Sequence, residues 1–220
     1  MFKQLPNQWT PVAPLTDLTD NPVSVELAGE QLVLFRDDAD KWHALRDYCP
    51  HRGARLSLGQ VSSEGHLRCG YHGWRFDGAG VCQGAPLNDM NAAALKKMSV
   101  TALPTRLIGG AVWVYTATDE NVAVPDPVLP ESLTGDARLY VTYQQFWKAH
   151  WTRAVENFID FTHPPYLHEQ TIGGWMHNYA ESGGLARVEA DETEFGMIMT
   201  SYLGNNDSGF QLHWYEPNLS

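Results

Sequence analysis

The sequence has few cysteines, a deficit of basic residues and no long apolar run, and each shortage excludes a class of protein. Three cysteines cannot all pair with one another, which favours metal or redox use in the cytoplasm over a disulfide framework. The 15 Lys and Arg stand against 26 Asp and Glu, and the net charge of −11 argues against a nucleic-acid partner. The longest apolar-rich run, residues 107–115, is too short to span a membrane. The start of the chain has no apolar signal core, so secretion is not expected.

The first half of the chain predicts short strands and tight turns. Apolar and polar residues alternate over Val23–Leu27, and residues 31–36 hold an apolar run, with a hairpin turn expected at Gly29-Glu30 between them. Residues 42–45 are a third strand candidate. The all-apolar run at residues 111–115 predicts a further strand that is buried.

A proline-rich acidic stretch separates the two halves. Residues 119–136 carry three prolines and five acids without a base, which is typical of a linker. We therefore divide the chain into a first domain, 1–118, a linker, 119–137, and a second domain, 138–220. In the second domain a helix is predicted over residues 151–162 and ended by Pro164-Pro165. Strands are expected at residues 138–147, 186–190, 195–203 and 210–215.

Two short glycine-flanked loops each carry one thiolate and one imidazole. The first holds Cys49 and His51, the second Cys69 and His72, and 17 residues lie between His51 and Cys69. Two cysteines on one iron and two histidines on the other form the ligand set of a Rieske [2Fe–2S] centre. Zinc is an alternative, but a zinc finger prefers Cys-x-x-Cys with His-x-x-x-His, and the sequence has neither pair. Buried cysteines beside unrelated histidines are the other alternative. Cys82 lies outside the pattern and is interpreted as a small buried residue.

A second group of metal-binding residue types follows about 90 residues later. Asn157, Asp160 and His163 are spaced three apart, so one continuous helix would place them on the same face. His168 lies about 140° further round such a helix, and the two prolines are needed to bring it back towards His163. Two imidazoles, one carboxylate and open positions form the facial triad of a mononuclear Fe(II) oxygenase. An ordinary helix end, with His163 favourable to the helix dipole, is the alternative.

Both groups resemble the metal-binding motifs of Rieske non-heme iron oxygenases. The run Cys49-Pro50-His51-Arg52-Gly53 and the run from Cys69 to Phe76 are similar to the family's two cluster loops. Neither run holds the additional cysteine that respiratory Rieske proteins carry in each loop. The stretch from Asn157 to His168 resembles the family's mononuclear iron motif, slightly more in the phthalate-, vanillate- and pheophorbide-oxygenase-like branch. The resemblance implies an α+β fold, in which an antiparallel β Rieske domain precedes a helix-grip-like catalytic domain of antiparallel sheet and helices.

The resemblance also implies the role of each residue. The cluster ligands would be Cys49, His51, Cys69 and His72, and the ligands of the mononuclear iron would be His163 and His168. The catalytic residues would be Asp160, which bridges a cluster histidine to an iron histidine in this family, and Asn157, which lies beside the iron. The family's third iron ligand is a carboxylate well over one hundred residues past the second histidine. Only 52 residues follow His168, so we expect this ligand beyond Ser220 in a longer protein and assign none.

The activity implied is that of an oxygenase component. It would use O₂ and electrons from NAD(P)H, delivered by a ferredoxin or flavin reductase, to hydroxylate or oxidatively demethylate an organic, aromatic or cyclic substrate. A head-to-tail homotrimer is implied as well, because the bridged cluster histidine belongs to a neighbouring subunit in this family. The alternative is a non-catalytic Rieske electron carrier with an appended interaction domain, against which the length and the second histidine pair argue.

A local reversal of charge surrounds the two loops. Four arginines fall within 24 residues that contain a single acid, Glu64. These arginines are Arg52, Arg55, Arg68 and Arg75. They form either a docking patch for an acidic electron-transfer partner or structural pairs with Asp47 or Asp77, and the sequence leaves both open.

Overall fold

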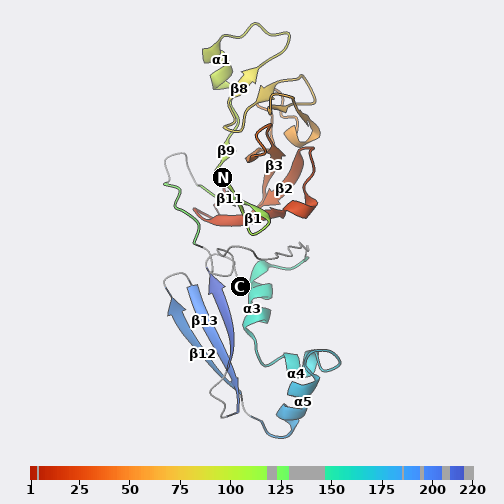
Figure 1. The fold of residues 1–220 in the computed structure, drawn as a ribbon, viewed down its shortest axis with the longest axis vertical. Helices are drawn as coiled ribbons and strands as arrows, with labels where there is room; N and C mark the ends of the chain where they lie inside the picture. Colours follow the sequence, from red (N-terminus) through yellow and green to blue (C-terminus); the bar gives the residue numbers. More distant parts are fainter. Residues whose placement is uncertain are drawn as a thin grey trace. The chain divides into compact units, whose positions relative to one another are not determined.

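The computed structural model describes residues 1–3, 5–117, 123–128, 147–184, 186–193, 196–204 and 209–215. The chain forms two compact units, Met1–Gln144 and Gln145–Ser220, and each is described by itself (Figure 1). Of the expected linker, residues 123–128 are described and contain no helix or strand. The strand expected at 138–147 lies outside the described residues except for Trp147, which is not in a strand.

The first unit contains a four-stranded antiparallel sheet built on the predicted hairpin. Its order is β2 (Val23–Leu27), β3 (Glu30–Arg36), β4 (Trp42–Arg46) and β9 (Ala102–Leu103). The turn between β2 and β3 is Ala28-Gly29, with φ of 49° and 80°, the left-handed conformations that a two-residue hairpin turn requires. The prediction of Gly29-Glu30 was therefore wrong by one residue, because Glu30 already pairs with Leu27 as the first residue of β3.

Both faces of strand β3 are buried, which explains its continuous apolar run. Val33 and Phe35 pack with Leu45 in one core, which also contains both cysteines of the predicted cluster. Leu32 and Leu34 point to the opposite face and join a second core. The loops that carry the predicted cluster residues are thus anchored on one face of a fully packed sheet.

Two smaller antiparallel sheets complete the first unit. One has the order β1 (Trp9–Pro14), β11 (Ala111–Tyr115) and β10 (Thr105–Ile108), and all five residues of β11 are buried as predicted. A 3₁₀ turn, η1 (Leu15–Asp17), follows β1.

The other small sheet surrounds the second predicted cluster loop. Its order is β5 (Gln60–Val61), β6 (Leu67–Arg68), β7 (Arg75–Phe76) and β8 (Cys82–Gly84), preceded by the 3₁₀ turn η2 (Leu56–Leu58). Helix α1 (Ala92–Lys97) follows and was not predicted. Its signal was Asn91, whose side chain accepts a hydrogen bond from the Ala94 amide as an N-cap.

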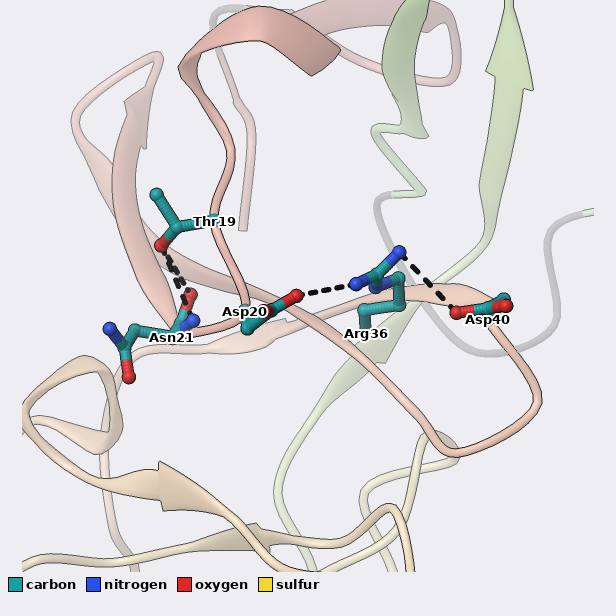
Figure 2. A network of polar contacts seen from close by, with 5 residues as sticks. All are labelled: Thr19, Asp20, Asn21, Arg36 and Asp40. Atoms are coloured by element: carbon teal, nitrogen blue, oxygen red, sulfur yellow. Dashed lines mark hydrogen bonds and ion pairs between the residues drawn. The ribbon is translucent and has the colours of Figure 1, made fainter.

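A half-buried arginine links two loops at one end of the four-stranded sheet. Figure 2 shows Arg36, the last residue of β3, between the carboxylates of Asp20 and Asp40. Thr19 and Asn21 bond to each other beside it, which closes the turn before β2. Asp20 and Asp40 are largely exposed, so these pairs contribute little to stability, about 0–1 kcal/mol each, and serve mainly to order the loops.

The second unit consists of a three-stranded antiparallel sheet and three helices within the described residues. The sheet has the order β12 (Ala186–Thr193), β13 (Gly196–Leu203) and β14 (Phe210–Tyr215), close to the predicted strands. The helices are α3 (Trp151–Ile159), α4 (Pro164–Leu167) and α5 (Gly174–Glu181). Helices α4 and α5 pack on each other (Figure 1). None of the described helices has the length and apolar character needed to cross a membrane.

Helix boundaries in this unit correct the sequence reading. Helix α3 ends at Ile159, not at residue 162, because Asp160 is extended and its side chain bonds to the Thr162 amide, an alternative to continuing the helix. The two prolines do not end this helix. They begin the next one, Pro164 occupying the first position of α4, where a missing N–H costs nothing. Helix α5 was not predicted.

Candidate metal centres

The first cluster loop closes on itself through backbone hydrogen bonds. The amide of Cys49 donates to the carbonyl of Ala54 at 2.8 Å, and the amide of Gly53 donates to the carbonyl of Cys49 at 2.8 Å. Gly53 has a φ of +73°, a left-handed conformation that favours glycine. Asp47, which precedes the loop, is tied to Ser57, which follows it, because the Asp47 carboxylate accepts hydrogen bonds from the amide and hydroxyl of Ser57.

The second cluster loop has the same construction. The amide of Cys69 donates to the carbonyl of Trp74 at 2.8 Å, and the amide of Gly73 donates to the carbonyl of Cys69 at 3.0 Å. Gly73 has a φ of +72°, one degree from its counterpart in the first loop. In each loop the cysteine therefore begins the same hydrogen-bonded backbone turn, although the histidine stands two residues after Cys49 and three after Cys69.

The two thiols meet in the core of the first unit. Cys49 and Cys69 are each 2% exposed, and all three cysteines of the chain are free. Burial and the neighbouring Cys69 thiol together raise the pKa of the Cys49 thiol to about 11, against the opposing effect of the hydrogen bond from the His51 amide. A second buried thiolate beside the first is thus costly without a cation, and iron would supply that charge as the protons leave.

The two imidazoles form a pair on the outer side of the loops. The rings of His51 and His72 have centroids 4.7 Å apart at 66°. Nδ1 of His51 is buried and has no hydrogen-bond partner, and desolvation, together with His72 and Arg52, lowers the pKa of its ring, which favours the neutral form that binds metal. His72 is exposed.

Sequence reasoning did not assign a role to Trp74, which the structure places against a cluster histidine. Its ring stacks on His51 with centroids 4.6 Å apart and planes 7° from parallel, and it is 3% exposed. The available signal was its position directly after His72-Gly73. Trp74 fixes the plane of the His51 ring and excludes water from that side.

The four residues fit a [2Fe–2S] cluster and not a single ion. Among the described residues, no three His, Cys, Asp or Glu side chains converge on one point, as a four-ligand zinc site would require. A two-iron cluster needs only two protein ligands on each iron, a cysteine pair on one and a histidine pair on the other. The buried thiol pair and the adjacent imidazole pair meet that requirement. Cys82 is buried in β8, and burial raises the pKa of its thiol, in keeping with its interpretation as a core residue.

The predicted iron histidines lie close together in the second unit. The rings of His163 and His168 have centroids 5.4 Å apart at 64°. They flank the short helix α4, since His163 is its N-cap and His168 its C-cap. The two prolines bring the rings together, as expected, although by starting a helix.

Of the two predicted catalytic residues, Asp160 lies near His163 in the structure. Oδ2 of Asp160 is 3.7 Å from Nδ1 of His163, longer than a hydrogen bond. Its Oδ1 accepts from the hydroxyl and the amide of Thr162, and these bonds, with the His163 charge, lower the pKa of Asp160. Asn157 is exposed on α3. Among the described residues, no carboxylate lies where it could serve as a third metal ligand beside the two histidines.

An apolar cavity lies beside α4. Its volume is about 170 Å³, and Pro165, Tyr166, Met176 and Leu203 are among the residues that line it. Sequence reasoning missed this cavity, in part because Met176, Tyr179 and Ala180 of α5, a helix that was not predicted, form one of its walls.

The arginines around the cluster loops do not form the ion pairs with Asp47 or Asp77 that were one of the two alternatives. Within the described part of the chain, Asp47 accepts from Ser24 and Ser57, and Asp77 accepts from backbone amides and Gln83. Neither carboxylate bonds to an arginine, so that alternative was wrong.

Comparison with known proteins agrees with these two centres. The model of the Rieske [2Fe–2S] domain family matches residues 8–124, which contain both cluster loops. Residues 147–216 match the vanillate O-demethylase oxygenase C-terminal domain, and this match contains the histidine pair. The chain belongs to the Rieske non-heme iron oxygenase family. The expected α+β fold and the expected branch of the family are therefore confirmed.

Curated relatives of this chain are oxygenases and demethylases. It is 34% identical to methylxanthine N1-demethylase NdmA of Pseudomonas putida, over 74% of this chain and 47% of that protein. It is also 34% identical to the chloroplastic pheophorbide a oxygenase of Arabidopsis thaliana, over 76% of this chain and 33% of that protein. The chain thus spans about a third to a half of the length of these relatives.

Solved structures share the fold. Dicamba monooxygenase bound to dicamba aligns with a TM-score of 0.74 at 24% identity, over 89% of this chain and 56% of that one. NdmA of Pseudomonas putida aligns with a TM-score of 0.72 at 28% identity, over 90% and 60%.

Proposed function

We propose that this chain is part of the oxygenase component of a Rieske non-heme iron system. The observation that carries the proposal is the pair of loops with the same backbone hydrogen bonds that bring two thiols and two imidazoles together, followed in the second unit by a close histidine pair. When bound, a [2Fe–2S] cluster supplies single electrons and a mononuclear Fe(II) supplies O₂ activation. We place the Rieske domain at 1–118, the linker at 119–137 and the catalytic domain at 138–220.

The first centre would be held by Cys49, Cys69, His51 and His72. The cysteine thiols lie in the core, so water is excluded from their side, whereas His72 is exposed. Electrons can therefore enter or leave on the histidine side without opening the core. Trp74 keeps the His51 ring in one plane.

The second centre would be held by His163 and His168. A small movement of Asp160 would let its free oxygen accept a hydrogen bond from Nδ1 of His163, which would fix the tautomer with Nε2 free for metal. Thr162 holds the other oxygen of this carboxylate and keeps it ionised. Asn157 would lie beside the iron. The third, carboxylate ligand is not assigned.

The substrate and the partners follow from the family. We propose that O₂ is used to hydroxylate or oxidatively demethylate an organic, aromatic or cyclic substrate, which the apolar cavity beside α4 supports. The electrons would come from NAD(P)H through a ferredoxin or flavin reductase. A homotrimer would join Asp160 to a cluster histidine of a neighbouring subunit. A cytoplasmic location is supported by the three free cysteines.

Iron per chain tests this proposal. The protein is purified without oxygen and its iron and zinc are measured, together with those of Cys49→Ser, His163→Ala and the control His213→Ala. About three iron atoms per chain are expected. Cys49→Ser should lose the two of the cluster, and His163→Ala should lose only the third. Zinc in place of iron would refute the proposal.

A non-catalytic Rieske electron carrier is the second candidate. One observation favours it: among the described residues, no carboxylate completes the histidine pair as a third metal ligand. About two iron atoms per chain, unchanged in His163→Ala, would support either the carrier or an oxygenase that needs the carboxylate expected beyond Ser220 to hold its mononuclear iron. A loss of one iron in that variant would exclude it.

A further inference from the structure

Two arginines face each other across a strand pair at the base of the second cluster loop. Arg68 in β6 and Arg75 in β7 are directly opposite in the antiparallel register, while the neighbouring pair, Leu67 and Phe76, is buried on the other face. Like charges placed directly opposite on one face of a sheet repel each other. An anion bound between them would relieve this repulsion.

An open groove lies on this arginine face. It is lined by Ser62, Arg68, Gly73, Arg75, Ala85 and Pro86. The guanidinium of Arg75 rests against the backbone of Gly84, where an added Cβ would lie 2.9 Å from Nη2. The groove therefore has two arginine side chains among its lining residues.

The donors of the groove are only partly used within the described structure. Nε of Arg75 is buried and has no hydrogen-bond partner, and Nη1 contacts Glu64 at 3.2 Å. Arg68 donates to the neutral side-chain oxygen of Gln60 at 2.7 Å. Two positive charges are thus balanced by a single exposed carboxylate, that of Glu64.

The groove adjoins the cluster loop in the chain itself. Arg68 directly precedes Cys69, Arg75 directly follows Trp74, and Gly73, which lines the groove, directly follows His72. A protein seated on the groove would be next to the second loop.

We propose that this groove is the docking site for a carboxylate side chain of an acidic protein that delivers electrons to the cluster. The inference rests on the proposed function and adds the surface and the chemistry of the partner. The planar guanidinium fork pairs with a carboxylate through two parallel hydrogen bonds. The local positive charge, on a chain of net charge −11, favours the approach of an acidic partner to this face.

Stopped-flow reduction of the holoprotein tests the proposal. The donor probe is an acidic plant-type [2Fe–2S] ferredoxin, which is oxidised by one electron as the Rieske cluster gains one, in the direction of their potentials. The second-order rate constant is measured against ionic strength for the wild type, the double variant Arg68→Gln/Arg75→Gln and Glu64→Gln. The matched control is Arg106→Gln, which removes an exposed arginine of β10 in the same unit. Photoreduced 5-deazariboflavin, a neutral reductant, reports on the cluster itself.

The rate constant is expected to change in opposite directions in the two test variants. At low ionic strength the double variant should be slower by about tenfold and Glu64→Gln faster by about twofold, since exposed charge pairs each change affinity by a few-fold. The control should stay within about twofold of the wild type. All rates should converge as salt screens the charges. Reduction by deazaflavin should be equal in all four proteins.

Other outcomes overturn the proposal. A double variant as fast as the control, or a slower Glu64→Gln, would show that the groove does not receive the donor. A smaller assembly in the double variant, measured by light scattering, would assign the groove to a contact between copies. A wild-type protein without a reducible cluster would instead refute the proposed function, and so the two failures are distinct.

Discussion

Replacing Asp47 should destabilise the first unit and release the cluster. Asp47 is 5% exposed, and its carboxylate accepts from the Ser57 amide at 2.8 Å, the Ser57 hydroxyl at 2.6 Å and the Ser24 hydroxyl at 3.2 Å. It lies two residues before Cys49, and Ser57 lies three residues after Ala54. The carboxylate therefore ties the two ends of the first cluster loop together.

The magnitude follows from these hydrogen bonds. A hydrogen bond to a charged group contributes about 1.5–3 kcal/mol, and the lower value for the two bonds from Ser57 gives about 3 kcal/mol for Asp47→Ala. Asp47→Asn keeps an acceptor for the Ser57 amide and should cost about 1 kcal/mol.

Urea denaturation measures both effects. The anaerobic holoprotein is unfolded while far-ultraviolet circular dichroism follows the backbone and visible absorbance follows the cluster. Asp89→Ala is the control, because Asp89 is exposed, and it should change the free energy of unfolding by less than about 0.5 kcal/mol. If Asp47→Ala is as stable as this control and keeps its cluster, the carboxylate does not hold the loop.

Three further changes test the packing around both centres. Thr162→Val removes the hydroxyl that contributes most to the lowered pKa of Asp160, so that pKa should rise towards its ordinary value in an NMR titration; an unchanged pKa would contradict the assignment. A lowered carboxyl pKa stabilises the fold at neutral pH, and this contribution is lost as the pH falls through the lowered pKa. Over that acid range the free energy of unfolding of Thr162→Val should therefore fall less than that of the wild type. Gly173→Ala would place a Cβ 1.9 Å from the carbonyl of Pro164, so it should cost about 2 kcal/mol and separate α4 from α5, whereas wild-type stability in urea would show that the helices yield freely. Trp74→Leu should lower the free energy of unfolding by about 2 kcal/mol through a cavity, and Trp74→Phe by less; equal values would show that the ring does not pack as described.

The sequence predicted the strands well because burial dictates their pattern. Residues of β3 alternate between two cores, and β11 is buried throughout, so both produce apolar runs that can be read directly. The cluster residues could also be predicted, because the loops repeat the same spacing of cysteine and glycine. The hairpin turn was misplaced by one residue because Ala28, without a turn signal of its own, adopts a left-handed conformation.

Helices were predicted less well because local hydrogen bonds and short lengths decide them. The spacing of Asn157, Asp160 and His163 fits one helix, but the side chain of Asp160 bonds to Thr162 and ends the helix first. The six residues of α1 are too few to show a period, and α5 buries only Met176. The stack of Trp74 on His51 and the facing arginines depend on tertiary contacts and register, which a single sequence does not display.

Nitrogen coordination of the reduced cluster tests the central claim most directly. The protein is produced with ¹⁵N-labelled histidine, reduced with dithionite and studied by electron–nuclear double resonance. Two histidine nitrogens bound to iron are expected, from His51 and His72, and the alanine variant of either residue should lose the cluster or this signature. A cluster signal without coupled histidine nitrogen, or a protein that holds zinc in these loops, would contradict the account.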